Sequence, residues 1–375
     1  MAKPSGKILS VCIPTYNRPE CMKNSLTHYA QIIQGGNLEG KVEICISDNS
    51  PNDETEKVVR QFSGRLDIRY SRNGNNLGYD RNAVLAVSLA SGRFAQLVGD
   101  ELMYGKQAME KAVGLLENDE FDSLMFDDDG LFPECHGMPY LAKDGSMFWR
   151  KALSYEWVKR RSITHIDFII IRSSDFREYL KFLGGRIDGF YGLTFIQLSF
   201  YFFSFKRSRR VCIVDTVNEP VGPNVPESLG VYFPSDDARV IYYKYFFEIR
   251  ECRKNGILSE EEYTRFKRNF LLSAITHLLR IRTHMYPPIY KKEEADTLKH
   301  IILVENEYAG FGQTALWLLR KILFIEPLPY HLLYRAFVFY RNRILRKPRP
   351  SALELYERCL DGEKIDKSRL YKTDF

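Results

Sequence analysis

The chain has 375 residues, 45% hydrophobic and 27% charged, which is typical of a globular protein with two domains or one large one. The net charge of +6 is uneven, because residues 1–140 hold 14 basic and 20 acidic side chains while the remainder holds 40 and 28. No run reaches the roughly 18 apolar residues that cross a bilayer, the opening MAKPSGK lacks the apolar core of a signal peptide, and the seven cysteines show no paired spacing. A membrane span, a secreted disulfide frame and a zinc site are therefore not expected.

Predicted strands and helices alternate through the first 130 residues. Short β-branched or apolar runs predict strands at 8–13, 42–47, 67–71, 94–98 and 122–126. Apolar residues at helical spacing predict helices between them, at 20–34, 53–63, 79–91 and 105–118. This order predicts an α/β fold, a mostly parallel sheet with helices on both faces. Further along, the sequence predicts strands at 164–172 and 210–215 and mainly helical structure at 236–283 and 294–345.

Polar loops follow four of the predicted strands, at the edge where α/β sheets bind ligands. Their sequences are PTYNR, SDNSPND, GNNLGYDRN and GDEL. In the last loop, Asp100 and Glu101 stand side by side directly after an apolar run. They form either a metal site or an ordinary solvated turn.

Four segments in the same order resemble family 2 glycosyltransferases with the GT-A (Rossmann-like) fold. They read SVCIPTYNRPE, ICISDNSPND, NNLGYDRNAVLAVSLASGRF and LVGDEL. The resemblance covers about residues 7–130 and continues more weakly to about 221. Within the family, the GDE form and the later FIIIR and YGLTFIQL stretches are most similar to abequosyltransferase-type enzymes of bacterial surface polysaccharides.

The resemblance also suggests a division of the chain. A GT-A domain is expected over 1–222, with a nucleotide-binding half at 1–130 and an acceptor half at 131–222. The Pro/Gly-rich stretch EPVGPNVPESLG marks the boundary, and a mainly helical, basic and aromatic domain is expected over 223–375.

By resemblance, Pro14, Thr15 and Tyr16 line the pocket for the nucleotide base, with Tyr16 stacking on it. A plain strand-to-helix turn explains the same residues. Arg18 either reaches a phosphate or faces solvent.

Asp48 ends the second predicted strand, where a carboxylate can accept the N3–H of a uracil. The alternative is an Asx-turn that caps the next element. Asp53 is the better candidate for the helix cap, which would leave Asp48 for the ligand.

A glycine and an arginine mark the start of the third predicted helix. Asn76, Gly78, Arg81 and Asn82 precede or open this helix, whose N-terminus permits close approach of an anion. Arg81 on the first turn could meet the diphosphate. The alternative is an ordinary turn with a solvent-facing arginine.

The resemblance implies a divalent metal, Mg²⁺ or Mn²⁺, that neutralises charge on the leaving diphosphate. The family motif has aspartates at its first and third positions, whereas this chain has Gly99, Asp100 and Glu101. Glu101 is therefore the expected metal ligand, and Asp100 is expected to touch the ribose or a metal-bound water. The missing carboxylate at Gly99 predicts modest metal affinity.

An inverting transferase needs a carboxylate base to take the proton of the acceptor hydroxyl. By resemblance, this residue follows the metal motif by roughly ninety positions, and Asp188 lies 87 positions after Glu101 in the loop GGRIDGFYG. Asp129, in the acidic run 127–129, is the reserve candidate. His165 could be a further metal ligand, but a lone histidine beside a strand is more often structural.

The C-terminal segment 311–350 mixes aromatic residues and leucines with eight basic side chains and one acid. Basic amphipathic helices can lie on an anionic membrane surface, which suits an acceptor carried on a lipid diphosphate. The alternative is that these helices pack on the catalytic domain. No nucleic-acid motif accompanies the charge, so nucleic-acid binding is not expected.

Together these patterns predict an inverting glycosyltransferase that moves a sugar from a nucleotide-sugar donor, preferably UDP-linked, to a growing, lipid-linked bacterial surface oligosaccharide. The expected location is the cytoplasm, peripheral to the inner face of the plasma membrane. One alternative is a sugar-nucleotide nucleotidyltransferase, although PTYNRPE lacks the glycines expected after its first strand. The other is a non-catalytic sugar-nucleotide-binding or scaffold protein of a polysaccharide assembly complex.

Overall fold

The computed structural model describes residues 6–103, 105–127, 140–142, 153, 169–193, 195–208, 210–215, 222–223 and 238–270. By internal contacts the chain divides into two compact units. The first comprises Met1–Pro234 and Lys244–Asn269, and the second comprises Ser235–Tyr243 and Phe270–Phe375. Nearly all of the second unit lies outside the described residues, including the basic segment 311–350.

An eight-stranded mixed sheet forms the centre of the first unit, in the order β3-β2-β1-β4-β8-β6-β9-β7. Its strands are β1 (Leu9–Thr15), β2 (Val42–Asp48), β3 (Ile68–Arg72), β4 (Phe94–Leu97), β6 (Ser123–Asp127), β7 (Tyr140–Ala142), β8 (Ile169–Arg172) and β9 (Val211–Asp215). Strands β3, β2, β1 and β4 run parallel, as do β6 and β9, whereas β8 lies antiparallel between β4 and β6. A short ribbon pairs β5 (Leu102–Met103) with β10 (Gly222–Pro223). The predicted α/β class with a mostly parallel sheet is confirmed.

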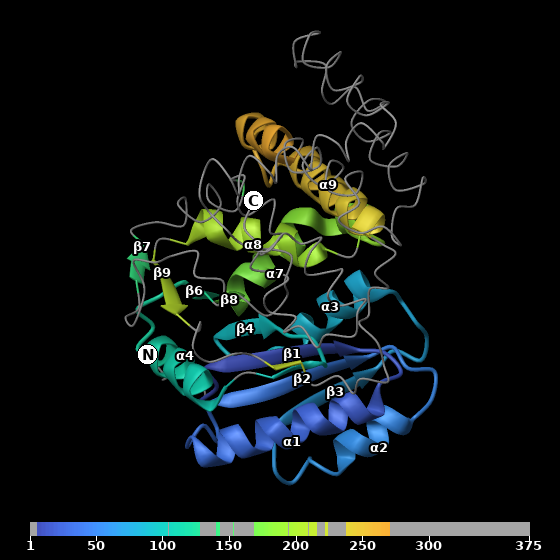
Figure 1. Ribbon diagram of the computed structural model, residues 1–375, viewed down its shortest axis with the longest axis vertical. Coiled ribbons are helices and arrows are strands. Elements are labelled where there is room, and N and C mark those ends of the chain that lie inside the picture. Colours follow the sequence, from blue (N-terminus) through green and yellow to red (C-terminus); the bar gives the residue numbers. More distant parts are fainter. Residues whose placement is uncertain are drawn as a thin grey trace, which may run out of the picture. The chain divides into compact units, whose positions relative to one another are not determined.

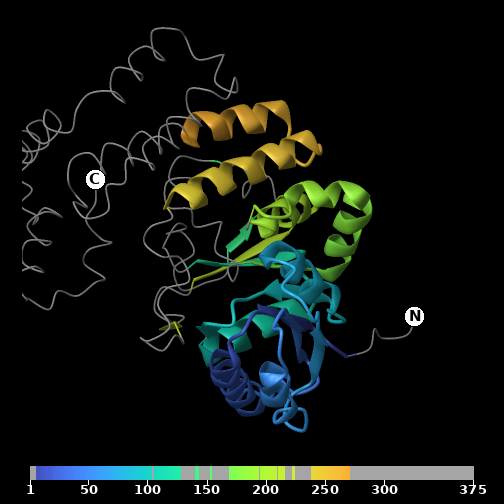
Figure 2. The ribbon, with the colours of Figure 1, turned by 90° about the vertical axis from the view of Figure 1, so that its right-hand side faces the viewer.

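Helices cover both faces of this sheet (Figures 1 and 2). On one face lie α1 (Pro19–Gly35), α2 (Glu54–Arg60) and α4 (Lys106–Glu117); on the other lie α3 (Tyr79–Ser88), α7 (Ser173–Leu183) and α8 (Ile196–Arg207). The 3₁₀ segment η3 (Gly184–Phe190) joins α7 to the turn before α8. The predicted helices of the first 130 residues correspond to α1–α4, whereas α7, η3 and α8 were not predicted.

The strands alternate in the way that a sheet buried on both faces requires. Leu9, Val11 and Ile13 of β1 belong to the hydrophobic core that also contains residues of α1 and α4. Cys12 faces the other way and is equally buried, as is Ala83 of α3. β1 continues through Pro14 to Thr15, two residues beyond the predicted end. Its pairing with β4 stops at Cys12, so Pro14 comes after the last register pair with that strand.

The helices that follow residue 237 bear on the predicted domain boundary. Residues 223–375 were expected to form a separate domain, and this boundary stays a prediction. However, α9 (Ala238–Lys254) from Lys244 onward and the helix at 260–270 pack with the first unit as far as Asn269. Tyr245 of α9 meets Phe266 edge-on, with ring centroids 5.4 Å apart.

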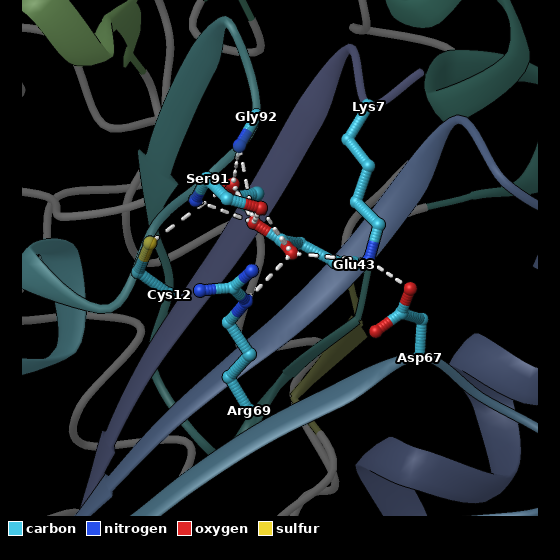
Figure 3. A network of polar contacts seen from close by, with 8 residues as sticks. Lys7, Cys12, Glu43, Asp67, Arg69, Ser91 and Gly92 are labelled. Carbon is cyan, nitrogen blue, oxygen red and sulfur yellow. Dashed lines mark hydrogen bonds and ion pairs between the residues drawn. The ribbon is translucent and has the colours of Figure 1, made fainter. Parts of the chain in front are cut away.

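At the amino ends of β1, β2 and β4, a buried carboxylate holds the strands together (Figure 3). Glu43 is fully buried and accepts hydrogen bonds from Ser10 Oγ (2.6 Å), Ser91 N (2.7 Å) and Gly92 N (3.1 Å). Arg69 Nε lies 3.2 Å from the same carboxylate. Burial opposes ionisation, but the hydrogen bonds from Ser10, Ser91 and Lys7 outweigh it and lower the pKa of Glu43 to about 2. The network lies at the opposite end of the strands from the polar loops.

Candidate active site

The polar loops meet at the carboxyl edge of the parallel strands. Thr15 at the end of β1 is the register partner of Asp48 at the end of β2, and Asp48 is the partner of Arg72 at the end of β3. Asp100 follows β4, the other neighbour of β1. The structure therefore brings together residues that are up to 85 positions apart, such as Thr15 and Asp100.

Arg18 connects the two neighbouring acids of the GDEL loop. Its Nη1 donates to Asp100 Oδ1 at 2.8 Å and also contacts Glu101 Oε2. Thr15 Oγ1 donates to the other oxygen of Asp100 at 2.7 Å, and Ser25 Oγ of α1 donates to its carbonyl oxygen at 2.7 Å. Arg18 therefore does not face bulk solvent; its side chain is 8% exposed.

The electrostatics of this cluster follow from burial. Burial raises the pKa of Asp100 to about 6, although the hydrogen bond from Thr15 and the charge of Arg18 oppose the rise. Burial also disfavours charge on Arg18, but its contacts with Asp100 and Glu101 outweigh that effect and raise its pKa. The result is a cation held at the edge of the sheet between two carboxyl groups.

Glu101 is the more accessible of the two acids, with a side chain that is 33% exposed against 6% for Asp100. Both oxygens of Asp100 accept hydrogen bonds, one from Thr15 and one from Arg18, so its carboxylate holds Arg18 in place. Among the residues that the structure describes, no group of three or more His, Cys, Asp and Glu gathers around a point. Two carboxylates fit a divalent cation only when phosphate oxygens and waters complete its shell, so Glu101 and Asp100 fit a metal bound together with a diphosphate.

Asp48 is fully buried and both of its oxygens have donors. Oδ1 accepts from Ser50 N at 2.8 Å, which closes an Asx-turn, and Oδ2 accepts from Tyr70 OH at 2.8 Å. Burial, followed by this bond to Asp48, raises the pKa of Tyr70. Each carboxylate oxygen has two lone pairs, so neither oxygen is saturated, although the side chain as it stands is closed to solvent.

Asp53 does not cap α2 in the way that the sequence suggested. It stands at the N-cap position of α2, but its side chain makes no capping hydrogen bond, so this expectation was wrong. Its carboxylate instead lies 3.0 Å from Lys57, whose hydrogen bond lowers the pKa of Asp53. The Asx-turn and a ligand role are nevertheless not exclusive at Asp48, because the turn uses one oxygen only.

Tyr16 follows β1 with 37% of its surface exposed, so its ring is available for stacking at this edge. Pro14, one of the other two expected pocket residues, is the register partner of Ser47 of β2. Asn17 has a positive φ of 54° and donates its N–H to Ser50 Oγ at 2.8 Å. Asparagine tolerates this left-handed conformation better than most residues.

Four asparagine side chains connect the loops, and sequence reasoning missed two of them. Asn73 Nδ2 contacts Asn49 Oδ1 (2.9 Å) and Asn82 Oδ1 (3.2 Å), while Asn82 Nδ2 donates to Thr15 O at 2.9 Å. Asn76 Oδ1 accepts from Asn49 Nδ2 at 3.2 Å. Asn76 and Asn82 were expected from sequence, but Asn49 and Asn73 were not, and the position of these two directly after β2 and β3 was the signal that could have identified them.

The start of α3 contacts both the polar loops and the segment that contains Asp188. Gly78 has φ 81°, a conformation that favours glycine, and its carbonyl accepts from Asn49 Nδ2 at 3.2 Å. Arg81 Nη2 lies 3.4 Å from Asp188 Oδ1, and its guanidinium lies 4.3 Å from the centre of the Tyr191 ring. The expected diphosphate ligand and the expected base are thus neighbours, with side chains 50% and 69% exposed.

Two of the predicted residues, Asp129 and His165, lie outside the described part of the chain. Asp127 of the same acidic run ends β6. Within the described part of the chain, every helix is too short or too polar to cross a bilayer.

The mostly parallel sheet and the arginine-bridged acids at its carboxyl edge define an α/β protein with a candidate polar site at the ends of its strands. Residues 10–180 match the family model described as glycosyl transferase family 2. The chain thus carries a glycosyltransferase family 2 domain, and the resemblance drawn from its sequence is confirmed.

Part of the chain is similar in sequence to a characterised glycosyltransferase. Over 107 residues it is 37% identical to abequosyltransferase RfbV of Salmonella typhimurium, a match that covers 27% of this chain and 30% of that protein. The match thus spans less than a third of that relative.

Two solved structures show similar chain traces at low sequence identity. One is S. aureus TarS 1–349 (16% identity, 79% of each chain, TM-score 0.49). The other is a mannosyltransferase of Pyrobaculum calidifontis, solved with GDP-Man and Mn²⁺ (12% identity, 86% of each chain, TM-score 0.48). Similarity at this level carries no conclusion about the substrate of this chain.

Proposed function

We propose that this chain is an inverting glycosyltransferase that uses a nucleotide-sugar donor, preferably UDP-linked. The observation that carries the proposal is the cluster of Arg18, Asp100 and Glu101 beside Asp48 at the carboxyl edge of the sheet, within a family 2 domain. A base-recognition group and a charged group for a diphosphate are what such a donor requires.

In the proposed site, Tyr16 and Asp48 hold the nucleotide base, and Arg18 and Glu101 lie toward the diphosphate. A divalent metal, Mg²⁺ or Mn²⁺, bound by Glu101 with the phosphates would supply charge neutralisation at the leaving group. Arg18 must then share Glu101 with the metal or release it, because its guanidinium already contacts that carboxylate. This competition is consistent with modest metal affinity.

The proposed reaction is a single displacement. The acceptor hydroxyl oxygen forms a bond to the anomeric carbon, the bond from that carbon to the diphosphate oxygen breaks, and Asp188 takes the hydroxyl proton. Asp188 suits this role because it is 69% exposed and stands beside Arg81. Asp129 remains the reserve candidate for the base.

The proposed acceptor is a growing surface oligosaccharide, carried on a lipid. The partial match to an abequosyltransferase supports transfer of a sugar in polysaccharide synthesis. The basic and aromatic segment 311–350 supports contact with an anionic membrane from the cytoplasmic side. Vesicle flotation with and without phosphatidylserine tests this contact, and equal binding to neutral vesicles contradicts the electrostatic part.

The first test is isothermal titration of UDP with and without Mn²⁺. Wild type is compared with Glu101→Ala and with Glu39→Ala, a control that removes an exposed acid from another loop. Metal-dependent binding that only Glu101→Ala loses supports the proposed clamp. Binding that ignores both metal and substitution removes Glu101 as a metal ligand.

The same protein preparations distinguish the alternatives. If UDP does not bind, titrations with CDP and dTDP decide whether another nucleotide takes its place. UDP binding without UDP release from any UDP-sugar, across a panel of acceptors, favours a non-catalytic binding protein. Release of pyrophosphate from UTP and a sugar phosphate favours a nucleotidyltransferase.

A further inference from the structure

Consecutive residues at the start of α3 reach across to the segment that follows Asp188. Asp80 is 2% exposed, and its Oδ2 accepts a hydrogen bond from Gly192 N at 2.7 Å. Its Oδ1 accepts from Ile196 N at 3.3 Å. Before it in the chain, Tyr79 OH donates to Gln197 Oε1 at 3.4 Å.

Asp80 accepts a hydrogen bond from the first residue of α8, a helix that has no side-chain cap of its own. This helix begins at Ile196, and Phe195 at its N-cap has no side chain that can cap it. The first N–H groups of a helix have no partner within the helix, and a carboxylate near them is favourable. Gly192, in the turn before α8, has a positive φ of 91°. The hydrogen bond from its backbone amide to Asp80 holds this turn in place. Asp80 thus supplies, from a different helix, the cap that α8 lacks.

The opposite side of the same turn of α3 belongs to the nucleotide edge. Asn82 Nδ2 donates to Thr15 O at 2.9 Å, and the carbonyl of Gly78 accepts from Asn49 Nδ2 at 3.2 Å. One helical turn therefore contacts the loops expected to bind the donor and, through Asp80, the segment 188–196. A helical turn is stiff, so displacement at one side is transmitted to the other.

We propose that Asp80 is a positioning residue that fixes the segment 188–196, and with it Asp188, relative to the nucleotide site. The inference rests on the proposed function, because it gives that segment the role of presenting the base to the acceptor. Arg81 contributes from the next position by its contacts with Asp188 and Tyr191. Binding of a nucleotide is thereby coupled to order in the segment 188–196.

A second buried acid lies near Asp80, and it bears on which of the two carries the negative charge. Glu248 of α9 is fully buried, and burial, with the charge of Asp80 next in importance, raises its pKa well above the usual value. This rise favours the neutral form of Glu248, and it is Asp80 whose carboxylate accepts the hydrogen bonds of the two backbone amides. Asp80→Asn keeps the shape, loses the charge and turns an N–H₂ group toward one of these donors.

The test is hydrogen–deuterium exchange of peptides that contain Gly192 and Ile196, with UDP as the probe. In wild type, UDP is expected to slow exchange in these peptides. In Asp80→Asn, exchange without UDP is expected to rise about tenfold or more, the loss expected for hydrogen bonds to a charged group, and the UDP effect is expected to disappear. The UDP dissociation constants of wild type and Asp80→Asn should differ by less than about twofold, because the segment 188–196 is ordered most of the time in both proteins.

The matched control is Asp175→Asn. Asp175 of α7 also anchors α8, but both of its side-chain partners belong to that helix: Ser204 Oγ donates to it at 2.9 Å, and Arg207 Nε lies 3.8 Å away. This variant should keep the UDP effect on the peptides around Gly192 and Ile196. A purely structural role of Asp80 would make the two variants behave alike.

Each outcome decides one point. If UDP binds both proteins and Asp80→Asn keeps the UDP-induced slowing, the inference about Asp80 is wrong while the proposed function stands. If Asp175→Asn loses the slowing as well, Asp80 has no special role. If UDP fails to bind wild type, UDP as the donor nucleotide is rejected, and the same exchange comparison is made with CDP or dTDP, whichever binds; slowing that Asp80→Asn keeps then rejects the coupling through Asp80.

Discussion

Replacement of Glu43 by glutamine should destabilise the first unit strongly at neutral pH and less in acid. Glu43 is fully buried at the amino ends of the strands and accepts from Ser10, Ser91 and Gly92, with Arg69 beside it (Figure 3). Its pKa falls from 4.5 to about 2 on folding. At about 1.4 kcal/mol per pH unit, this shift corresponds to about 3 kcal/mol of stability at pH 7.

The sign of the pH dependence follows from the lowered pKa. Because the folded pKa lies below the unfolded one, the contribution is complete above about pH 4.5 and is lost as the pH falls toward 2. By pH 3.5 it should have decreased to about 2 kcal/mol. Protonated Glu43 presents one O–H to its donors, much as a glutamine amide at the same position presents N–H₂, so wild type and Glu43→Gln should converge in acid.

The assay is urea denaturation followed by far-ultraviolet circular dichroism between pH 7 and pH 3.5. Exchange of peptides from β1 and β2 reports the same strands directly. The control is Glu39→Gln, which removes a charge at an exposed position before β2 and should change stability by less than about 0.5 kcal/mol. A free-energy difference between wild type and Glu43→Gln that is small at pH 7, or that grows as the pH falls, would refute the reasoning.

Three further substitutions test neighbouring parts of the structure. Gly92→Ala should lower the free energy of unfolding by about 1–3 kcal/mol in urea, because its Cβ would lie 2.8 Å from Ser10 Oγ, and an unchanged midpoint contradicts this. Tyr70→Phe removes the hydroxyl that orients Asp48, so UDP affinity measured by titration should fall by about two- to tenfold. Equal affinity would show that Tyr70 has no part in recognition of the base. Arg18→Ala leaves a buried carboxylate without its cation and should destabilise by about 3 kcal/mol, a loss that urea denaturation at pH 7 either shows or disproves.

The sequence by itself determined the alternation of strands and helices and the edge at which polar loops gather. β-Branched runs, helical spacing and turn residues are local signals, and parallel strands separated by helices place their carboxyl ends together. For this reason PTYNR, SDNSPND, GNNLGYDRN and GDEL could be assigned to one edge from the order of elements along the chain. The strand register and the bond from Arg18 to Asp100 agree with that assignment for the ends of β1, β2, β3 and β4.

Tertiary structure alone decided which side chains meet there. The bridge from Arg18 to Asp100 spans 82 positions, and the bond from Gly192 to Asp80 spans 112. No local periodicity encodes such pairs, because they depend on how whole elements pack. The antiparallel entry of β8 between β4 and β6 is of the same kind. Asp48 gives the smallest example: its Asx-turn with Ser50 is local and was expected as an alternative, whereas its bond from Tyr70 exists only because β2 and β3 pair in that register.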